Sequence, residues 1–485
     1  MLINFENITA RRTGRLVFPK TNFAIPPATC IGIAGKNGSG KTTFLSIIAG
    51  KLPIIEGKVL KDENQLISSL CHLVEFNMFK LLPIFIEHYY QQRYHAYGPE
   101  AFPKVWDFLI NKRNIFIETP LKDEAFEEQV NDWLIFFGIE SLKNVSVIQL
   151  SNGEQKRLML IKALLCNPKV LLLDEPYVGL DKNGVDILNN MLMRLLTIGK
   201  SIVMVSAEMN FPEFCTIRYQ VSECEIRLLK DKDLTGIKKI SLPIPNPVAN
   251  PQELIYFDHI RIQSNGRSLL DDIDWKVYES ECWWIHGENG SGKSTLLSLI
   301  FADHPQAYAQ KINVFGIPRY GGNSIWEIKQ QIGFISPEFQ LQFEHRCSCQ
   351  QIIGSGIQEN KPLERTLTKE VWQEAYNLLE QLEIAYLADK YFNEISTGEQ
   401  RMVLLLRAFI KNPKVLILDE PFQGIDHQTQ NNMLTYIAHY ISANPKTAIL
   451  FTTHQYESIP NFITHQLKLS FGRLIEKKVY QSENE

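Results

Sequence analysis

The sequence predicts an α/β protein of two consecutive domains of one kind, each with an inserted helical subdomain. Its 485 residues exceed what a single compact core holds. A glycine-rich segment at Gly35–Gly50 recurs at Gly287–Ala302, and the block Leu150–Pro176 recurs at Ile395–Pro421. Within each copy of the block, the first serine and the last aspartate lie 23 residues apart. Because this interval is equal over a mixed helix–strand stretch, we infer an internal duplication.

The boundary between the copies is predicted at a proline-rich segment. Leu242–Pro251, with the sequence LPIPNPVANP, holds four prolines, which deny donors to helices and sheets and favour an extended spacer. The two copies also open alike, with FENITARRTGRLVF at Phe5 and FDHIRIQSNGRSLL at Phe257. We therefore predict a first domain at residues 1–240, a linker at 241–252 and a second domain at 253–485.

Two kinds of apolar run predict the central strands of each domain. CIGIAG from Cys30 and CWWIHG from Cys282 end in glycine, as expected of a strand that leads into a phosphate-binding loop. VLLLDE from Val170 and VLILDE from Val415 are continuous aliphatic runs, typical of parallel strands buried on both faces. Two poorly matched regions, at about 51–147 and 303–393, contain helical patterns such as EAFEEQVNDWLIFFG and KEVWQEAYNLLEQL. We place the inserted helical subdomains there.

Composition indicates an ordinary water-soluble protein. Hydrophobic residues make up 45% and charged residues 21%, and the net charge of -4 argues against nucleic acid as a bulk electrostatic partner. The eight cysteines form no C-x-x-C pair, so we expect mostly buried, reduced thiols. The N-terminal segment MLINFENITARR lacks a signal-peptide pattern, and no apolar run is long enough for a membrane span. We therefore expect a cytoplasmic protein, either free or peripheral at the inner membrane.

Two segments fit the phosphate-loop pattern G-x-x-x-x-G-K-[ST]. Glycines let the backbone N–H groups turn toward phosphates, and the following helix adds its positive N-terminal dipole. Lys41 and Lys293 should reach the β- and γ-phosphates of a nucleotide, while the Thr42 and Ser294 hydroxyls should bind Mg²⁺. The predicted phosphate-binding residues are Gly35, Asn37, Gly38, Ser39, Gly40, Lys41, Thr42 and Thr43, and Gly287, Asn289, Gly290, Ser291, Gly292, Lys293, Ser294 and Thr295.

Each aliphatic strand ends in Asp-Glu-Pro. Asp174 and Asp419 end the strands, where a parallel sheet delivers carboxylates to a nucleotide crevice, and we expect them to hold Mg²⁺. Glu175 and Glu420 follow and should point differently, so they are candidates to polarise the attacking water. The simpler alternative is a solvated strand end followed by a turn.

Two S-x-x-E segments open the repeated block. Taken alone, Ser151–Glu154 and Ser396–Glu399 predict capping boxes that start helices. A capped helix start with a flexible glycine is also a site for an anion. If a helical subdomain intervenes, neither segment reaches its own phosphate loop, but each can face the loop of another domain. The predicted contacts to that nucleotide are Ser151, Asn152 and Gly153, and Ser396, Thr397 and Gly398.

In order along the chain, these motifs resemble those of the ATP-binding-cassette superfamily. The signatures LSNGEQ and ISTGEQ, the strands LLLDEP and LILDEP, and the following Gly-x-Asp turns carry the resemblance, which spans nearly the whole chain. The fused pair and short linker are most similar to the bacterial group of ModF, molybdate-transport ATP-binding proteins, and photorepair protein PhrA. Each half is therefore expected to be a P-loop NTPase cassette domain that uses ATP and Mg²⁺.

The resemblance also implies a head-to-tail sandwich, with each ATP between one domain's phosphate loop and the other domain's signature. One site would combine Lys41, Thr42, Asp174 and Glu175 with Ser396–Gly398. The other would combine Lys293, Ser294, Asp419 and Glu420 with Ser151–Gly153. Fusion raises the effective concentration of the two domains, so that the closed state can form within one molecule.

The sequence departs from the family pattern at three places. The switch histidine after the Asp-Glu strand is His454 in the second domain, but Ala207 stands at that position in the first. We therefore expect the first site to turn over more slowly, with Glu175, Glu420 and His454 as the catalytic residues. Where the family has a coupling glutamine and an adenine-stacking aromatic, this chain offers Glu75, Glu338 or Gln340, and Arg12 and Ser264.

Four kinds of ATPase stay open. The resemblance favours a ModF-like ATPase that docks on a separate membrane permease. The fused motor of a conventional importer is disfavoured because the coupling glutamine is missing. A ribosome-associated cassette protein would carry a long, charged linker, and a DNA-repair ATPase would carry coiled-coil arms or zinc motifs. Beyond ATP, we expect a permease as partner rather than ribosome or nucleic acid, and we expect the two cassettes to pair with each other.

Overall fold

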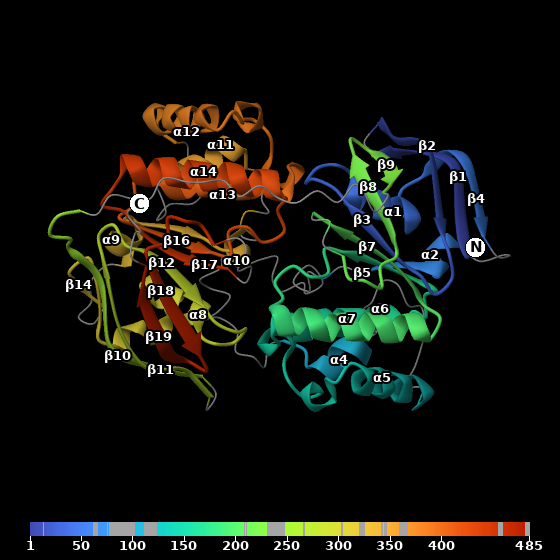
Figure 1. Cartoon of the computed structure of the whole chain (residues 1–485), viewed down its shortest axis with the longest axis horizontal. Coiled ribbons are helices and arrows are strands. Elements are labelled where there is room, and N and C mark those ends of the chain that lie inside the picture. Colours follow the sequence, from blue (N-terminus) through green and yellow to red (C-terminus); the bar gives the residue numbers. More distant parts are fainter. Residues whose placement is uncertain are drawn as a thin grey trace. The chain divides into compact units, whose positions relative to one another are not determined.

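The computed structural model shows two compact units, Met1–Ile237 and Lys238–Glu485, here called the first half and the second half (Figure 1). It describes residues 1–12, 14–61, 66–74, 76, 102–110, 124–207, 209, 211–229, 248–264, 267–301, 304–319, 325–340, 343, 347–357, 367–453 and 459–480. Most of the predicted proline-rich linker lies outside these residues, so the domain boundaries stay a prediction.

The first half contains two sheets. A six-stranded sheet has the order β5-β6-β7-β3-β8-β9, in which only the last pairing, β8 with β9, is antiparallel. A three-stranded antiparallel sheet has the order β2-β1-β4. The strands are β1 (Ile3–Arg12), β2 (Arg15–Ile25), β3 (Cys30–Ala34), β4 (Ile54–Lys61), β5 (Cys71–Val74), β6 (Val170–Asp174), β7 (Ser201–Ser206), β8 (Ile217–Ser222) and β9 (Glu225–Leu228).

The second half repeats this topology. Its six-stranded sheet has the order β15-β16-β17-β12-β18-β19, and its antiparallel sheet the order β11-β10-β13-β14. The strands are β10 (Glu253–Ser264), β11 (Arg267–Tyr278), β12 (Cys282–His286), β13 (Ile312–Val314), β14 (Ile317–Pro318), β15 (Ile332–Ile335), β16 (Val415–Asp419), β17 (Ala448–Thr452), β18 (His465–Ser470) and β19 (Arg473–Val479). The equal strand order agrees with the duplication inferred from the sequence.

Helices cover the six-stranded sheet of each half. Those of the first half are α1 (Lys41–Ile48), α2 (Ile67–Leu70), α4 (Val105–Ile110), α5 (Glu124–Phe136), α6 (Asn152–Leu164) and α7 (Lys182–Thr197). Those of the second half are α8 (Lys293–Ile300), α9 (Ile325–Lys329), α10 (Pro337–Gln340), α11 (Cys349–Gly354), α12 (Lys369–Gln381), α13 (Thr397–Phe409) and α14 (His427–Ala443). Short 3-10 turns lie at Glu140–Leu142, Val147–Gln149, Pro305–Ala309, Ala385–Leu387 and Phe392–Glu394.

Strand β6 separates two hydrophobic cores, which explains its continuous aliphatic sequence. Leu171 and Leu173 pack into a core with helices α4 to α7. Val170 and Leu172 point to the opposite face and pack with α1 and the antiparallel sheet. All four side chains are fully buried. Each apolar side chain of this size stabilises the fold by roughly 1.5–3 kcal/mol when buried, so these strands anchor the Asp-Glu pair that follows them.

The described parts of the inserted regions contain both helices and strands. The pattern at Glu124 forms α5 and the pattern at Lys369 forms α12, as predicted. However, each region begins with strands: β4 and β5 in the first half, and β13 to β15 in the second. The sequence missed β4 because most of its side chains are exposed, so its alternation of apolar and polar residues is weak.

Three expectations from composition can be compared with the structure. All eight cysteines are free, and five of them are buried. Within the described residues, no group of His, Cys, Asp and Glu side chains could hold a metal ion by itself. No helix in the same part of the chain is long and apolar enough to cross a membrane.

Candidate active sites

The phosphate loop of each half joins a central strand to a buried helix. In the first half, the loop follows β3 and ends at Gly40, whose φ of 107° is a left-handed conformation that suits glycine. The Lys41 ammonium folds back over the loop and donates to the carbonyl oxygens of Gly35 at 2.6 Å and Lys36 at 3.1 Å. This arrangement holds a cation over the loop where a phosphate chain would bind.

The second loop has the same geometry. Gly292 adopts a φ of 103°, and Lys293 donates to the carbonyls of Gly287 at 2.8 Å and Glu288 at 3.0 Å. The hydroxyls of Ser39 and Ser291 are buried in the two loops, and neither has a hydrogen-bond partner in the described part of the chain. Because buried hydroxyls are normally paired, a bound phosphate oxygen would complete each loop.

In each half, a hydroxyl at the start of the helix after the phosphate loop lies close to the aspartate carboxylate that ends the buried strand. Thr42 Oγ1 donates to Asp174 Oδ2 at 2.8 Å, across 132 residues of sequence. Ser294 Oγ and Asp419 Oδ2 are 3.4 Å apart in the second half. Hydroxyl and carboxylate oxygens are the ligands that Mg²⁺ prefers, so these pairs fit the ion that the sequence predicts. Within each half, the fold therefore brings the predicted loop and strand residues together.

The glutamates after these strands share an uncommon backbone conformation. Glu175 and Glu420 have φ of 49° and 47°, in the left-handed region that costs a non-glycine residue on the order of 1 kcal/mol. The turn directs each glutamate away from the preceding aspartate. In the first half it brings Glu175 Oε1 to 3.9 Å from the Lys41 ammonium. The two halves therefore hold their candidate catalytic glutamates in the same backbone conformation.

Both signature segments form the capping boxes that the sequence predicts. Ser151 Oγ accepts from the backbone N–H of Glu154, whose carboxylate accepts from the backbone N–H of Ser151 at 2.7 Å. Ser396 and Glu399 make the same pair at the start of α13. The segments therefore begin α6 and α13 with defined geometry. Their pairing with the other half's phosphate loop stays a prediction.

Comparison with known families assigns these motifs. The model of the ABC transporter family matches residues 18–178 and 270–423, which contain the phosphate loop, the signature and the Asp-Glu strand of each half. The chain belongs to the ABC transporter ATP-binding family. Its two halves are two cassettes of this family in tandem.

Curated relatives share the tandem organisation along the chain. The ABC transporter ATP-binding protein ModF of Escherichia coli K12 is 30% identical over 476 residues, which cover 92% of this chain and 93% of ModF. An ABC transporter ATP-binding protein of Schizosaccharomyces pombe, described as uncharacterized, is 28% identical over 505 residues and covers 98% of this chain and 99% of its own length.

Solved structures support the ABC fold. An archaeal ribosome recycling factor in complex with a ribosomal stalk protein aligns over 98% of this chain and 90% of its own chain, with a TM-score of 0.53. A ribosome-bound archaeal assembly of Pelota and ABCE1 gives a TM-score of 0.60 over 98% of this chain and 78% of that chain. Both are 17% identical to this chain, so they show the fold alone.

The two ABC sites differ at a residue that the sequence analysis missed. In the second half, the hydroxyl of Thr452 donates to Asp419 Oδ1 at 2.6 Å and accepts from the backbone N–H of Glu420 at 3.0 Å. The equivalent strand position in the first half is Val205, which has no hydroxyl. The available signal was the polar residue Thr452, which directly follows the apolar run AILF at residues 448–451 and ends the strand.

The switch position is only partly described. Ala207 follows β7 and is half-buried, and its methyl group cannot hydrogen-bond a phosphate. His454 lies outside the described residues, so its catalytic role stays a prediction.

The candidate coupling residues are also only partly described. Glu75 and the side chain of Glu338 lie outside the described residues. Gln340 hydrogen-bonds Gln400 of the signature helix α13, and Gln400 in turn donates to the Phe392 carbonyl at 2.7 Å. Gln340 is therefore the coupling candidate that the structure places against the signature helix.

A buried lysine connects the signature helix of the first half with its Asp-Glu strand. Lys156 of α6 is 7% exposed, and its ammonium lies 3.4 Å from the Glu175 carbonyl oxygen and 4.4 Å from the centre of the Phe76 ring. Burial lowers the pKa of Lys156 to about 7, although the Glu175 carboxylate partly opposes this shift. The second half has Arg401 at the equivalent position, and this side chain is also buried.

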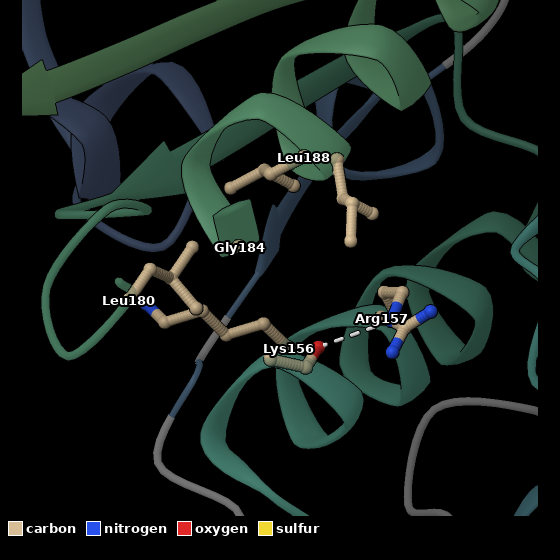
Figure 2. Close-up of a pocket in the computed structure, with 7 residues that line it drawn as sticks. Lys156, Arg157, Leu180, Gly184 and Leu188 are labelled. Atoms are coloured by element: carbon tan, nitrogen blue, oxygen red, sulfur yellow. Dashed lines mark hydrogen bonds between the residues drawn. The ribbon is translucent and has the colours of Figure 1, made fainter. Parts of the chain in front are cut away.

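The cavity beside Lys156 is too small for a substrate. It lies between α6 and α7 and encloses about 30 Å³, with Lys156, Arg157, Leu180, Gly184 and Leu188 around it (Figure 2). Such a volume holds about one water molecule. Arg157 Nε donates to the Gly153 carbonyl at 3.4 Å, which ties the side chain of Arg157 to the first turn of α6.

Proposed function

We propose that this chain binds Mg-ATP in both cassettes and hydrolyses it, with the second cassette the faster. The observation that carries the proposal is the convergence, in each half, of a loop lysine, a helix hydroxyl and the Asp-Glu pair. The proposed phosphate and metal contacts of the first half are Lys41, Thr42 and Asp174, and those of the second half are Lys293, Ser294 and Asp419.

The chemistry follows from these positions. Thr42 with Asp174, and Ser294 with Asp419, would hold Mg²⁺, and the ion would supply positive charge against the β- and γ-phosphates. The loop lysine, already held over the loop by two carbonyl oxygens, adds a second positive charge. Glu175 or Glu420 accepts a hydrogen bond from the attacking water and orients it toward the γ-phosphate. In the second half, Thr452 holds both the Asp419 carboxylate and the Glu420 backbone, which favours a fixed geometry there.

For the physiological role, we propose a ModF-like ATPase that acts with a separate membrane permease in a process related to molybdate transport. The support is the 30% identity with ModF over most of both chains. Of the competing roles, the importer motor also predicts a membrane permease as partner of the ATP-bound state, whereas the ribosome-associated factor predicts the ribosome.

Trapping the ATP-bound state tests both the proposed ATPase activity and the proposed role in transport. Full-length Glu420→Gln protein should retain bound ATP after desalting and should capture a membrane permease from detergent-solubilised cells. A Lys41→Ala, Lys293→Ala double variant is the matched control, and it should retain no ATP and capture no partner. Failure of the Glu420→Gln protein to retain ATP would contradict the ATPase proposal. Capture of ribosomes in place of a permease would contradict the transport role alone.

A further inference from the structure

An arginine stands beside the first phosphate loop, at the position where the sequence offers no aromatic residue for stacking the base. Arg12 ends strand β1, and its guanidinium donates to the Thr43 hydroxyl in the first turn of α1. The positive charge of Arg12 also acts on the Cys224 thiol: burial raises the pKa of this thiol, and Arg12 partly opposes the rise. Cys224 itself lies against Gly40 of the loop.

Arg12 lines a surface pocket of about 220 Å³. The other lining residues are Thr42, Thr43, Ser46, Lys51 and Leu52. The pocket thus carries two positively charged side chains, three hydroxyls and one apolar residue. The Ser46 hydroxyl donates to the Thr42 carbonyl at 2.8 Å, so it is turned toward its own helix. Within this described lining there is neither an aromatic ring to stack on a base nor a carboxylate or amide to read its edge.

The pocket lies beside the first turns of α1, and Thr42 and Thr43 both line it. The proposed γ-phosphate end is marked by Asp174, which accepts from the Thr42 hydroxyl at 2.8 Å, and by Glu175, whose carboxylate lies 3.9 Å from the Lys41 ammonium. Arg12 contacts α1 one residue beyond the proposed metal ligand Thr42. Since a phosphate loop cradles the α- and β-phosphates with its backbone, we place the charge of Arg12 next to the α-phosphate and ribose of a bound nucleotide.

We propose that the first cassette binds nucleoside triphosphates through Arg12 at the α-phosphate end, without distinguishing adenine from guanine. This inference rests on the proposed nucleotide-binding function of the same loop. A guanidinium makes strong charge-assisted hydrogen bonds to phosphate oxygens, whatever the base. Discrimination between bases needs edge contacts that leave the wrong base with unpaired groups, and the described pocket provides none.

The test uses the full-length chain with Lys293→Ala, so that nucleotide binding reports the first cassette. Calorimetric Kd values for Mg-ATP and Mg-GTP should agree within about threefold. Adding Arg12→Ala should weaken both nucleotides by about tenfold or more, because one charge-assisted contact is lost. Arg12→Lys should restore part of the affinity for both. Arg11→Ala removes the same charge at the neighbouring exposed position and should change neither value.

The possible outcomes distinguish a failure of this inference from a failure of the proposed nucleotide binding by the first phosphate loop. A tenfold preference for ATP in the Lys293→Ala chain, or an Arg12→Ala loss confined to ATP, would show that the base is recognised and would overturn the inference alone. An unchanged Kd in Arg12→Ala, with intact folding by circular dichroism, would also overturn it. Absence of any nucleotide binding to the Lys293→Ala chain would overturn the proposed function of the first loop, and the Arg12 inference with it.

Discussion

At the scale of single residues, one hydroxyl distinguishes the two ABC sites within the described structure. Thr452 connects the metal-binding candidate Asp419 with the backbone of Glu420, whereas Val205 stands at the equivalent position of the first half. Asp419 is buried and Asp174 is half-buried. A buried carboxylate depends more strongly on its hydrogen bonds, so the second site should be more sensitive to their loss.

A reciprocal exchange tests the role of this hydroxyl. Thr452→Val keeps the side-chain shape but removes two hydrogen bonds, so ATPase activity should fall roughly tenfold, the effect of about 1.4 kcal/mol in the barrier. Val205→Thr is the matched change in the first half and should leave activity unchanged or raise it. Steady-state phosphate release measures both variants. Equal losses in the two variants would contradict a specific role for Thr452.

At the scale of elements, two sets of contacts hold the first turns of the signature helix α6 in place. The Ser151–Glu154 capping box holds its start, and Lys156 links its buried face to the carbonyl of Glu175. The resemblance to the family assigns Ser151–Gly153 and Glu175 to different ATP sites. Lys156 therefore connects the signature helix with the Asp-Glu pair within one half.

The lowered pKa of Lys156 gives a testable pH dependence of stability. The folded protein releases this proton at about pH 7, whereas an unfolded lysine keeps it to about pH 10.4. Between these values the unfolded state binds more protons, so the free energy of unfolding rises with pH, and the penalty of burial is complete below pH 7. Lys156→Met removes the titrating group. In urea unfolding, the stability gained by the variant should be largest at pH 6.5 and should shrink by pH 9.5. A gain that is independent of pH would contradict the assigned pKa.

The sequence predicted those features of the fold and the sites whose residues lie close together along the chain. The phosphate loops, the Asp-Glu strands and both capping boxes are encoded in short segments, and the structure has them where the sequence places them. The contacts of Thr452 and Arg12 join residues about thirty positions apart, through sheet register or strand-to-helix packing. No short motif encodes such pairs. Strand β4 was missed because its exposed side chains carry little hydrophobic periodicity.

At the scale of the whole molecule, duplication has produced two halves with one topology and unequal sites. Both six-stranded sheets have the same strand order, and both place a lysine, a hydroxyl and an Asp-Glu pair at corresponding positions. The second half adds Thr452 and carries the predicted switch residue His454, while the first has Val205 and Ala207. The account therefore predicts that ATP turnover comes mainly from the second cassette.

The most direct measurement compares steady-state ATPase activity in full-length Glu175→Gln and Glu420→Gln variants. Each change removes a carboxylate charge and preserves side-chain size, and the two positions share the same backbone conformation. The account predicts that Glu175→Gln keeps most of the wild-type rate, whereas Glu420→Gln falls at least about tenfold below it. Equal residual activity in the two variants would contradict the claim that the cassettes are unequal.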